Sequence, residues 1–191
     1  MPFQRELRDL SFVPRWGILK TINTQSVAEH SYYVAMYADQ LADVIEWGGP
    51  RDKLMKYCLW HDVEEVITGD IPGPAKRAMM RQVEGPKWVK ERMEERFGDE
   101  NHINPDTEAE FDQIRKIVKV ADLIDEVLFL VTETVMGNRS VAENLTYSRD
   151  RLFSAFHDLD WIDSHVEQHR LFSIINDAVD KSHRFTSKVV E

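Results

Sequence analysis

The sequence predicts an all-α protein that folds as a single domain over residues 1–191. Only seven prolines and eight glycines occur in 191 residues, which is too few for the closely spaced turns of a β domain. Long stretches instead repeat apolar residues at the three-and-four spacing of an amphipathic helix. The length fits one ordinary domain, and no internal repeat or low-complexity segment divides it. We therefore expect a helical bundle with one core.

The chain is acidic, and its charge limits the partners that its surface can attract. It contains 34 Asp and Glu against 24 Lys and Arg, a formal charge of −10, which argues against a general nucleic-acid or membrane-surface binder. No apolar run is long enough to span a bilayer, the N-terminus lacks a signal-peptide pattern, and the single cysteine, Cys58, excludes an internal disulfide framework. These features predict a cytoplasmic protein in which any phosphate ligand meets positive charge locally.

The first element is a short amphipathic helix over residues 3–12, which ends ahead of Pro14 because a proline disfavours helical geometry in the residue before it. Arg15 and Trp16 follow in the loop. A guanidinium beside a large flat ring suits an anionic group attached to a planar one. The competing interpretation is a surface arginine beside a tryptophan that fills the core.

The second helix begins at Ser26. Residues 26–29 (SVAE) match the capping box, in which the serine and the glutamate each satisfy an exposed amide at a helix start. His30 then falls one turn into the helix, on the same face as the apolar residues Val27 and Val34. A buried imidazole without a partner leaves its polar nitrogens unsatisfied, so this position favours a shared ligand.

A further helical pattern over residues 54–70 carries the dipeptide His61-Asp62. One three-and-four stripe, which predicts that the imidazole points inward, contains Leu54, Cys58, His61 and Glu65. An adjacent His and Asp offer one nitrogen and one oxygen ligand to a borderline metal. Taken alone, the dipeptide fits a hydrogen-bonded core histidine better, so the choice depends on what else converges there.

A break with two glycines and two prolines follows over residues 68–74, and a new helix starts after it. Lys76 and Arg77 fall in its first turns, where backbone amides and the helix dipole favour an anion. Solvated surface cations are the competing interpretation. Residues 75–97 are densely charged, which predicts an exposed segment on the lid side of the site.

The longest helix is predicted over residues 107–137. Its apolar seam has the spacing of helix-bundle packing and consists of Ile114, Ile117, Ala121, Ile124, Leu128, Val131 and Val135. Asp122 lies beside this seam in an apolar setting, where an unpaired carboxylate is costly, so it needs a cation. Asp125 and Glu126 are expected to be solvated or salt-bridged. Two more helices are expected over residues 140–158 and 161–182.

Four side chains on three inward helix faces therefore form a candidate metal site. They offer two nitrogens and two oxygens, and they are His30, His61, Asp62 and Asp122. Such a set leaves positions open to water, which is typical of a catalytic metal site.

The order of His, then His-Asp, then Asp is also the metal-binding pattern of the HD-domain phosphohydrolases. Four segments in matching order over roughly residues 10–130 resemble the YfbR-like 5′-deoxynucleotidases of that group: Arg15-Trp16, residues 26–31 (SVAEHS), residues 60–72 (WHDVEEVITGDIP) and residues 119–122 (KVAD). The resemblance implies a single-domain HD-domain helical bundle whose four candidate ligands hold one divalent transition metal, such as cobalt, manganese or zinc.

The resemblance also implies roles at the substrate, which would be a deoxynucleotide. Arg15 would hold the phosphate, and Glu65 would be the catalytic residue that holds or deprotonates the attacking water. Trp16 would pack against the sugar and discriminate against ribose, and Asp70 would lie near the substrate. In the reaction that we expect, a 5′-monophosphate is hydrolysed to deoxynucleoside and phosphate while Arg15 and Lys76 neutralise the phosphoryl charge.

Two other functions stay open. The related DatZ-like dATP triphosphohydrolases share the pattern and release triphosphate. Ile18 and Lys76 resemble positions used there for base fit and triphosphate contact, and a triphosphate would bring a second divalent ion. A non-catalytic nucleotide-binding module is disfavoured because Glu65 and all four candidate ligands are present. We also expect a homo-oligomer, a dimer or larger, whereas base preference and the physiological metal lie beyond the sequence.

Overall fold

The computed structural model describes residues 5–76 and 107–162, together with residues 173 and 176. Apart from one isolated β-bridge between Pro14 and Ser26, the regular elements in these ranges are all helical: η1 (Arg5–Phe12), α1 (Val27–Val44), α2 (Arg51–Trp60), α3 (Glu65–Thr68), α6 (Glu108–Val135), η2 (Arg139–Val141) and α7 (Ala142–His157). The all-α prediction is confirmed. Arg77, the charged segment that follows it and most of the helix predicted over residues 161–182 lie outside the described residues.

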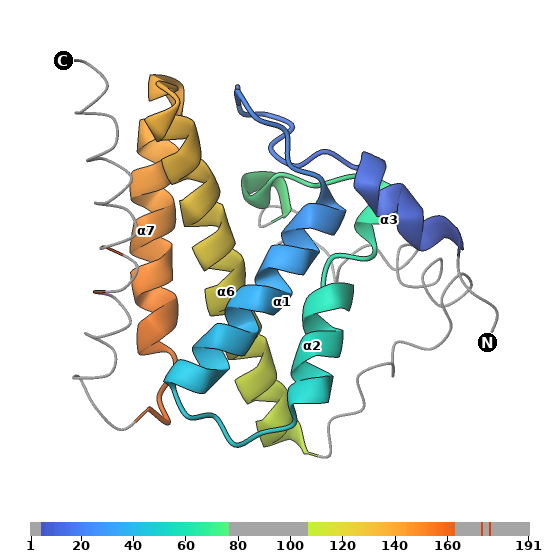
Figure 1. The fold of residues 1–191 in the computed structure, drawn as a ribbon, viewed down its shortest axis with the longest axis vertical. Coiled ribbons are helices and arrows are strands. Elements are labelled where there is room, and N and C mark those ends of the chain that lie inside the picture. Colours follow the sequence, from blue (N-terminus) through green and yellow to red (C-terminus); the bar gives the residue numbers. More distant parts are fainter. Residues whose placement is uncertain (1–4, 77–106, 163–172, 174–175, 177–191) are drawn as a thin grey trace.

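Helix α6 is the centre of the bundle. Helices α1 and α7 pack along it, and α2 packs against both α1 and α6 (Figure 1). The predicted seam of α6 faces this core: Leu128 and Val135 are half-buried against it, whereas the buried members are Ile114, Ile117, Ala121, Ile124 and Val131. None of the described helices is both long and apolar enough to cross a membrane.

The predicted capping box at the start of α1 is present. The Ser26 hydroxyl accepts a hydrogen bond from the Glu29 amide at 3.2 Å, and the Glu29 carboxylate accepts one from the Ser26 amide at 2.7 Å. These reciprocal bonds fix where the helix begins. They therefore also fix the face on which His30 lies, and its side chain is fully buried as expected.

The segment that carries His61 differs from the prediction of one helix over residues 54–70. Helix α2 ends at Trp60, and residues 61–64 form a turn that leads into α3. His61 Nδ1 donates to the Cys58 carbonyl at 2.7 Å, and in a continuing α-helix that carbonyl would accept the Asp62 amide. The next amide, of Val63, bonds to the Trp60 carbonyl, three residues back. This tighter turn separates two short helices and brings His61 and Asp62 to one wall of a cleft.

Helix α6 ends in a Schellman motif at Gly137, one of two glycines with positive φ in the described chain (φ +92°). The Asn138 amide bonds to the Glu133 carbonyl, and the Gly137 amide bonds to the Thr134 carbonyl, each at 3.0 Å. This geometry needs a left-handed residue, which glycine adopts without strain. The stop lets η2 and α7 turn back along α6 (Figure 1).

Candidate active site

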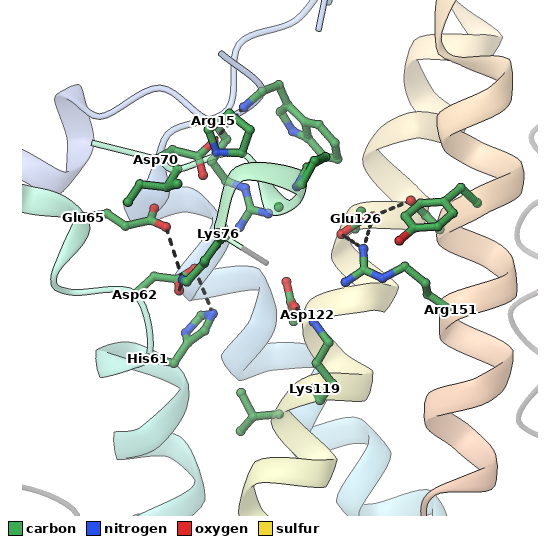
Figure 2. Close-up of a pocket in the computed structure, with 18 of the residues that line it drawn as sticks. Arg15, His61, Asp62, Glu65, Asp70, Lys76, Lys119, Asp122, Glu126 and Arg151 are labelled. Atoms are coloured by element: carbon green, nitrogen blue, oxygen red, sulfur yellow. Dashed lines mark hydrogen bonds and ion pairs between the residues drawn. The ribbon is translucent and has the colours of Figure 1, made fainter. Parts of the chain in front are cut away.

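An open cleft of about 1240 Å³, large enough for a nucleotide, opens beside the turn between α2 and α3. Its other walls come from α6, from α7, from the loop after η1 and from the segment after α3 (Figure 2). Nine of the ten predicted site residues line it: Arg15, Trp16, Ile18, His61, Asp62, Glu65, Asp70, Lys76 and Asp122. His30 is the tenth. It is fully buried, and its Nε2 atom lies 3.5 Å from Asp122 and 3.6 Å from Asp62.

Three of the four candidate metal ligands form one cluster of ligand atoms, and the fourth, Asp62, lies beside its two imidazoles. One ligand atom each from His30, His61 and Asp122 lies within 4.8 Å of the other two. Asp62 Oδ2 lies 3.2 Å from His61 Nε2. Two ligands of one tetrahedral zinc ion are about 3.3 Å apart when each bond is about 2.05 Å. The separations from the imidazole nitrogens to the carboxylate oxygens are therefore close to those of a single coordination sphere.

The protonation pattern of the two imidazoles fits a metal. His30 Nδ1 lies 2.7 Å from Asp125 Oδ2, and His61 Nδ1 lies 2.7 Å from the Cys58 carbonyl, so both Nδ1 atoms face acceptors. The proton of a neutral imidazole then sits on Nδ1, and Nε2 carries the free lone pair. Both Nε2 atoms are buried without a hydrogen-bond partner among the described residues. A buried nitrogen in this state is costly, and a metal ion would satisfy it.

The two candidate carboxylate ligands are held in their charged form. Burial alone would raise the pKa of both, but the neighbouring His61 lowers the pKa of Asp62, and Lys119 at 2.6 Å lowers the pKa of Asp122 to about 2. Burial by itself would lower the pKa of His61, yet Asp62 outweighs it and raises that pKa to about 9. Without a metal ion, His61 therefore holds a second proton on Nε2 near neutral pH, facing Asp62 at 3.2 Å, and a metal bound at Nε2 would displace this proton. Both carboxylates are thus available as anionic ligands at neutral pH.

Glu65 is the first residue of α3, and its side chain faces the cleft from the same wall as Asp62 (Figure 2). It is only 4% exposed, and its Oε2 atom has no hydrogen-bond partner in the described structure. Burial, followed by the charges of Asp62 and Asp70, raises the pKa of Glu65 to about 8. A carboxyl group with a pKa near neutrality and a free oxygen is suited to exchange protons with water.

Two cations flank these carboxylates. Arg15 Nη1 lies 4.0 Å from Asp62 Oδ2, and Lys76 Nζ lies 3.6 Å from Asp62 Oδ1 and 4.0 Å from Glu65 Oε1. Figure 2 shows the side chains of Arg15 and Lys76 extending toward the space between Asp62 and Asp122. Burial would lower the pKa of Lys76, but Asp62, Glu64 and Glu65 raise it, so the ammonium group stays charged. The cleft therefore carries local positive charge in a protein that is acidic as a whole.

Trp16 adopts a left-handed backbone conformation (φ +67°), which is strained for a residue with a side chain. Asp70 Oδ2 accepts the Trp16 amide at 3.0 Å, and the indole N–H donates to Gln25 Oε1 at 3.3 Å. The indole also stacks on Phe129 of α6, with ring centroids 5.1 Å apart. Trp16 is thus half-buried against the core and lines the cleft, so both interpretations of this residue describe part of its environment.

Asp125 was expected to be solvated or salt-bridged, and of these alternatives solvation is wrong, because its side chain is buried and paired with His30. Only 4% of the residue is exposed, and its Oδ2 atom accepts from both His30 Nδ1 and Gln25 Nε2. The signal was its position four residues after the buried Ala121, which places it on the inner face of α6. The salt bridge expected for Glu126 is present, since Arg151 Nη1 lies 3.0 Å away. Sequence reasoning missed Gln25 altogether.

Comparisons with known proteins agree with this geometry. The family model of the YfbR-like 5′-deoxynucleotidases matches residues 2–160. A 5′-deoxynucleotidase YfbR from Escherichia coli is 28% identical over 148 residues, which cover 71% of this chain and 74% of the relative.

Solved structures share the fold at lower identity. An HD-domain phosphohydrolase from Listeria innocua is 23% identical, with a TM-score of 0.67 over 92% of this chain and 87% of the other. The cyanophage S-2L HD phosphohydrolase DatZ, solved with dA and one catalytic Zn²⁺ ion, is 21% identical, with a TM-score of 0.56 over 98% of both chains. The chain belongs to the YfbR-like 5′-deoxynucleotidase family and is a deoxynucleotide phosphohydrolase with an HD-domain fold.

Proposed function

We propose that this protein hydrolyses deoxynucleoside 5′-monophosphates to deoxynucleoside and phosphate, with one divalent transition metal held by His30, His61, Asp62 and Asp122. The observation that carries the proposal is the pair of buried Nε2 atoms of His30 and His61, neither of which has a hydrogen-bond partner among the described residues. They lie 3.2–3.6 Å from the carboxylates of Asp62 and Asp122, beside a nucleotide-sized cleft. Mixed nitrogen and oxygen ligands suit zinc, cobalt or manganese.

The residues around the proposed metal site have separate tasks in hydrolysis. A bound divalent metal would supply a Lewis acid that makes water more acidic and polarises a phosphoryl oxygen. Arg15 and Lys76 bind the remaining phosphate oxygens and offset the charge that builds up as water attacks phosphorus. Glu65 accepts the proton of that water through its free Oε2 atom. The P–O bond to the 5′-oxygen then breaks, and the deoxynucleoside leaves once this oxygen has taken up a proton.

Trp16 is proposed as the residue that reads the sugar. It follows Arg15 directly and lines the same cleft, so a phosphate held by Arg15 places the deoxyribose near the indole. The only N–H of the indole donates to Gln25, so it offers no bond to a ribose 2′-hydroxyl. Asp70 contributes indirectly in this proposal, because its carboxylate holds the Trp16 backbone amide.

Triphosphate release from dATP is the second candidate function. Ile18 and Lys76 both line the cleft. Ile18 lies at its rim and is 75% exposed. The DatZ structure contains dA and zinc, which supports a related substrate class. A triphosphate would recruit a second divalent ion in this proposal. A non-catalytic nucleotide-binding module remains the third candidate, and it requires that Glu65 has no role.

The proposal extends to the protein as a whole. We propose one domain over residues 1–191, a homo-oligomer and a cytoplasmic location. Size-exclusion chromatography with light scattering tests the assembly, since a monomer at micromolar concentration contradicts it.

A substrate panel decides between the candidate functions. The wild-type protein loaded with Mn²⁺, Co²⁺ or Zn²⁺ is incubated with dAMP, AMP, dATP and ATP, and the released phosphate and triphosphate are quantified. We expect phosphate from dAMP with little turnover of AMP. Triphosphate released from dATP without phosphate from dAMP would replace the proposal with the second candidate. Nucleotide binding without turnover under every metal would support the third.

A further inference from the structure

We infer that Gln25 and Asp125 are positioning residues, which link His30, a proposed metal ligand, to Trp16, the residue proposed to discriminate against ribose. The role toward the sugar rests on the proposed function. A continuous path of hydrogen bonds links the four side chains. Trp16 Nε1 donates to Gln25 Oε1 at 3.3 Å, Gln25 Nε2 donates to Asp125 Oδ2 at 2.9 Å, and His30 Nδ1 lies 2.7 Å from the same oxygen. Three separate parts of the chain meet in this path: the loop after η1, α1 and α6.

Only one assignment of protons satisfies this path. The indole nitrogen of Trp16 can only donate, so Gln25 must face it with its oxygen. The Gln25 amide nitrogen then faces Asp125 and donates to it. If the amide were reversed, two donors would meet at Trp16 and two acceptors would meet at Asp125. Because an ionised Asp125 can only accept, His30 must donate from Nδ1, which leaves the lone pair of Nε2 for the metal.

The bridging residues are shielded from water, so solvent does not readily replace a lost bond. Gln25 is 6% exposed, Asp125 is 4% exposed and His30 is fully buried. Asp125 brings a negative charge to the far side of the imidazole ring, which strengthens His30 as a ligand and fixes its orientation. A neutral acceptor of the same shape would keep the orientation and lose this charge.

Gln25 also fastens the loop that carries the phosphate-binding residue. Its backbone carbonyl accepts the Arg15 amide at 2.8 Å while its side chain holds the Trp16 indole. One residue therefore sets the backbone position of Arg15 and the ring position of Trp16. Asp125 orients the proposed metal ligand His30, and Gln25 positions Trp16 beside the sugar. Because Gln25 and Asp125 are hydrogen-bonded to each other, a displacement of one side chain also moves the other.

The metal part is tested without any substrate. Apo protein and Asp125→Asn are titrated with Co²⁺ and Zn²⁺ in competition with a chelator, and the visible absorption of bound Co²⁺ is recorded. We expect a 10- to 100-fold weaker affinity and a changed Co²⁺ spectrum, as is usual when the hydrogen-bond partner of a metal-ligating histidine is altered, here by removal of its charge. Glu126→Gln is the control, because Glu126 is the neighbouring carboxylate of α6, and its hydrogen-bond partners among the described residues are Ser148 and Arg151 and no candidate ligand. Wild-type affinity in Asp125→Asn, or an equal loss in Glu126→Gln, overturns the inference.

The sugar part uses Gln25→Met, which keeps the length of the side chain and removes both of its hydrogen bonds. We expect the ratio of kcat/KM for dAMP over AMP to fall at least about 5-fold, with a smaller loss of metal affinity than in Asp125→Asn. Trp16→Phe removes the indole N–H together with part of the ring. It should lower the ratio less in the Gln25→Met background than in wild type, because the hydrogen bond is already broken there. If the two substitutions change the kcat/KM ratio independently, the hydrogen bond between Trp16 and Gln25 has no role in sugar discrimination.

The two parts fail in different ways. If no deoxynucleotide is hydrolysed by the wild-type protein, the proposed function is wrong, and the metal affinities still decide the role of Asp125. If hydrolysis occurs and Gln25→Met keeps the wild-type sugar ratio, the function stands and the role of Gln25 is refuted. A variant that does not fold is recognised by its circular dichroism. If Asp125→Asn does not fold, Asp125→Glu replaces it: this variant keeps the charge but shifts the carboxylate by one methylene, so its Co²⁺ spectrum should change, and wild-type affinity together with a wild-type spectrum would overturn the inference.

Discussion

Glu133→Gln should destabilise the fold strongly although Glu133 lies far along α6 from the candidate metal ligands. Its carboxylate is fully buried and faces three donors: the Ile22 amide at 2.6 Å, the Asn23 amide at 2.7 Å and Asn138 Nδ2 at 2.7 Å. Ile22 and Asn23 belong to the loop that leads from Trp16 to α1. This one side chain therefore ties that loop to the C-terminal end of the central helix.

The size of the effect follows from the donors. A glutamine amide has one oxygen, so its nitrogen must face at least one of the three N–H groups and leave it unpaired at a cost of about 1–3 kcal/mol. The two remaining bonds lose their charge assistance, at about 0.5–1 kcal/mol each. We expect the free energy of unfolding to fall by about 2–5 kcal/mol at pH 7.5.

The loss should depend on pH. Burial would raise the pKa of Glu133, but the amides of Ile22 and Asn23 and the side chain of Asn138 outweigh it and hold that pKa below its ordinary value of 4.5. A carboxylate with a lowered pKa in the folded state stabilises the fold above its unfolded pKa and ceases to do so as the pH falls through the folded pKa. The difference between wild type and Glu133→Gln should therefore shrink by up to about 0.8 kcal/mol between pH 7.5 and pH 4.

Urea unfolding followed by circular dichroism at the two pH values measures both quantities. Thr132→Ala is the matched control on the same helix: Thr132 is exposed and bonds only to the Leu128 carbonyl of its own helix, so the change should stay within about 0.5 kcal/mol. A loss below about 1 kcal/mol in Glu133→Gln, or a difference that grows toward pH 4, would refute the reasoning.

Three further predictions concern the cleft. His61→Ala or Asp122→Ala should abolish both metal binding and activity, because a small coordination sphere does not tolerate the loss of a ligand; full metal content by elemental analysis would remove either residue from the ligand set. Glu65→Ala should keep its metal and its substrate affinity while kcat falls by roughly 10²-fold or more, so near-wild-type turnover would exclude Glu65 as the proton acceptor. Trp16→Ala should narrow the preference for dAMP over AMP in kcat/KM by roughly 10-fold, about 1.4 kcal/mol, at unchanged metal content; an equal loss for both substrates would mean that the indole only packs.

Local signals in the sequence were sufficient for the helices that position the site. The capping box at Ser26 fixed the start of α1, and with it the inward direction of His30. The apolar seam of α6 had a long regular period, so Asp122 stood out beside it as a carboxylate that needs a cation. It is now found 3.5 Å from His30 and 2.6 Å from Lys119. Both inferences rest on periodicity over many residues, which sequence reports well.

Contacts between distant segments were beyond that kind of reasoning. The end of α2 at Trp60 depends on the His61 ring bonding to the Cys58 carbonyl, which competes with the helix and leaves no mark in the apolar pattern. The burial of Asp125 depends on His30 and Gln25, which lie 95 and 100 residues away in the chain. A carboxylate beside an apolar seam is usually solvated, and only the partner brought by the fold reverses that expectation.

The charges of the cleft give a physical reason to prefer a monophosphate as substrate. Asp62 and Asp122 together carry about two negative charges, which one divalent cation balances. Arg15 and Lys76, which now lie 4.0 and 3.6 Å from Asp62, would then have about two positive charges to offer to an anion. That matches a phosphate monoester near neutral pH, whose second pKa is about 6. Glu65, whose pKa is about 8, adds no charge while it is protonated and adds one negative charge in the ionised form that accepts the proton of water. A triphosphate brings roughly two more negative charges into the same space, and only a further cation would offset them, which is why a second divalent ion belongs to that alternative.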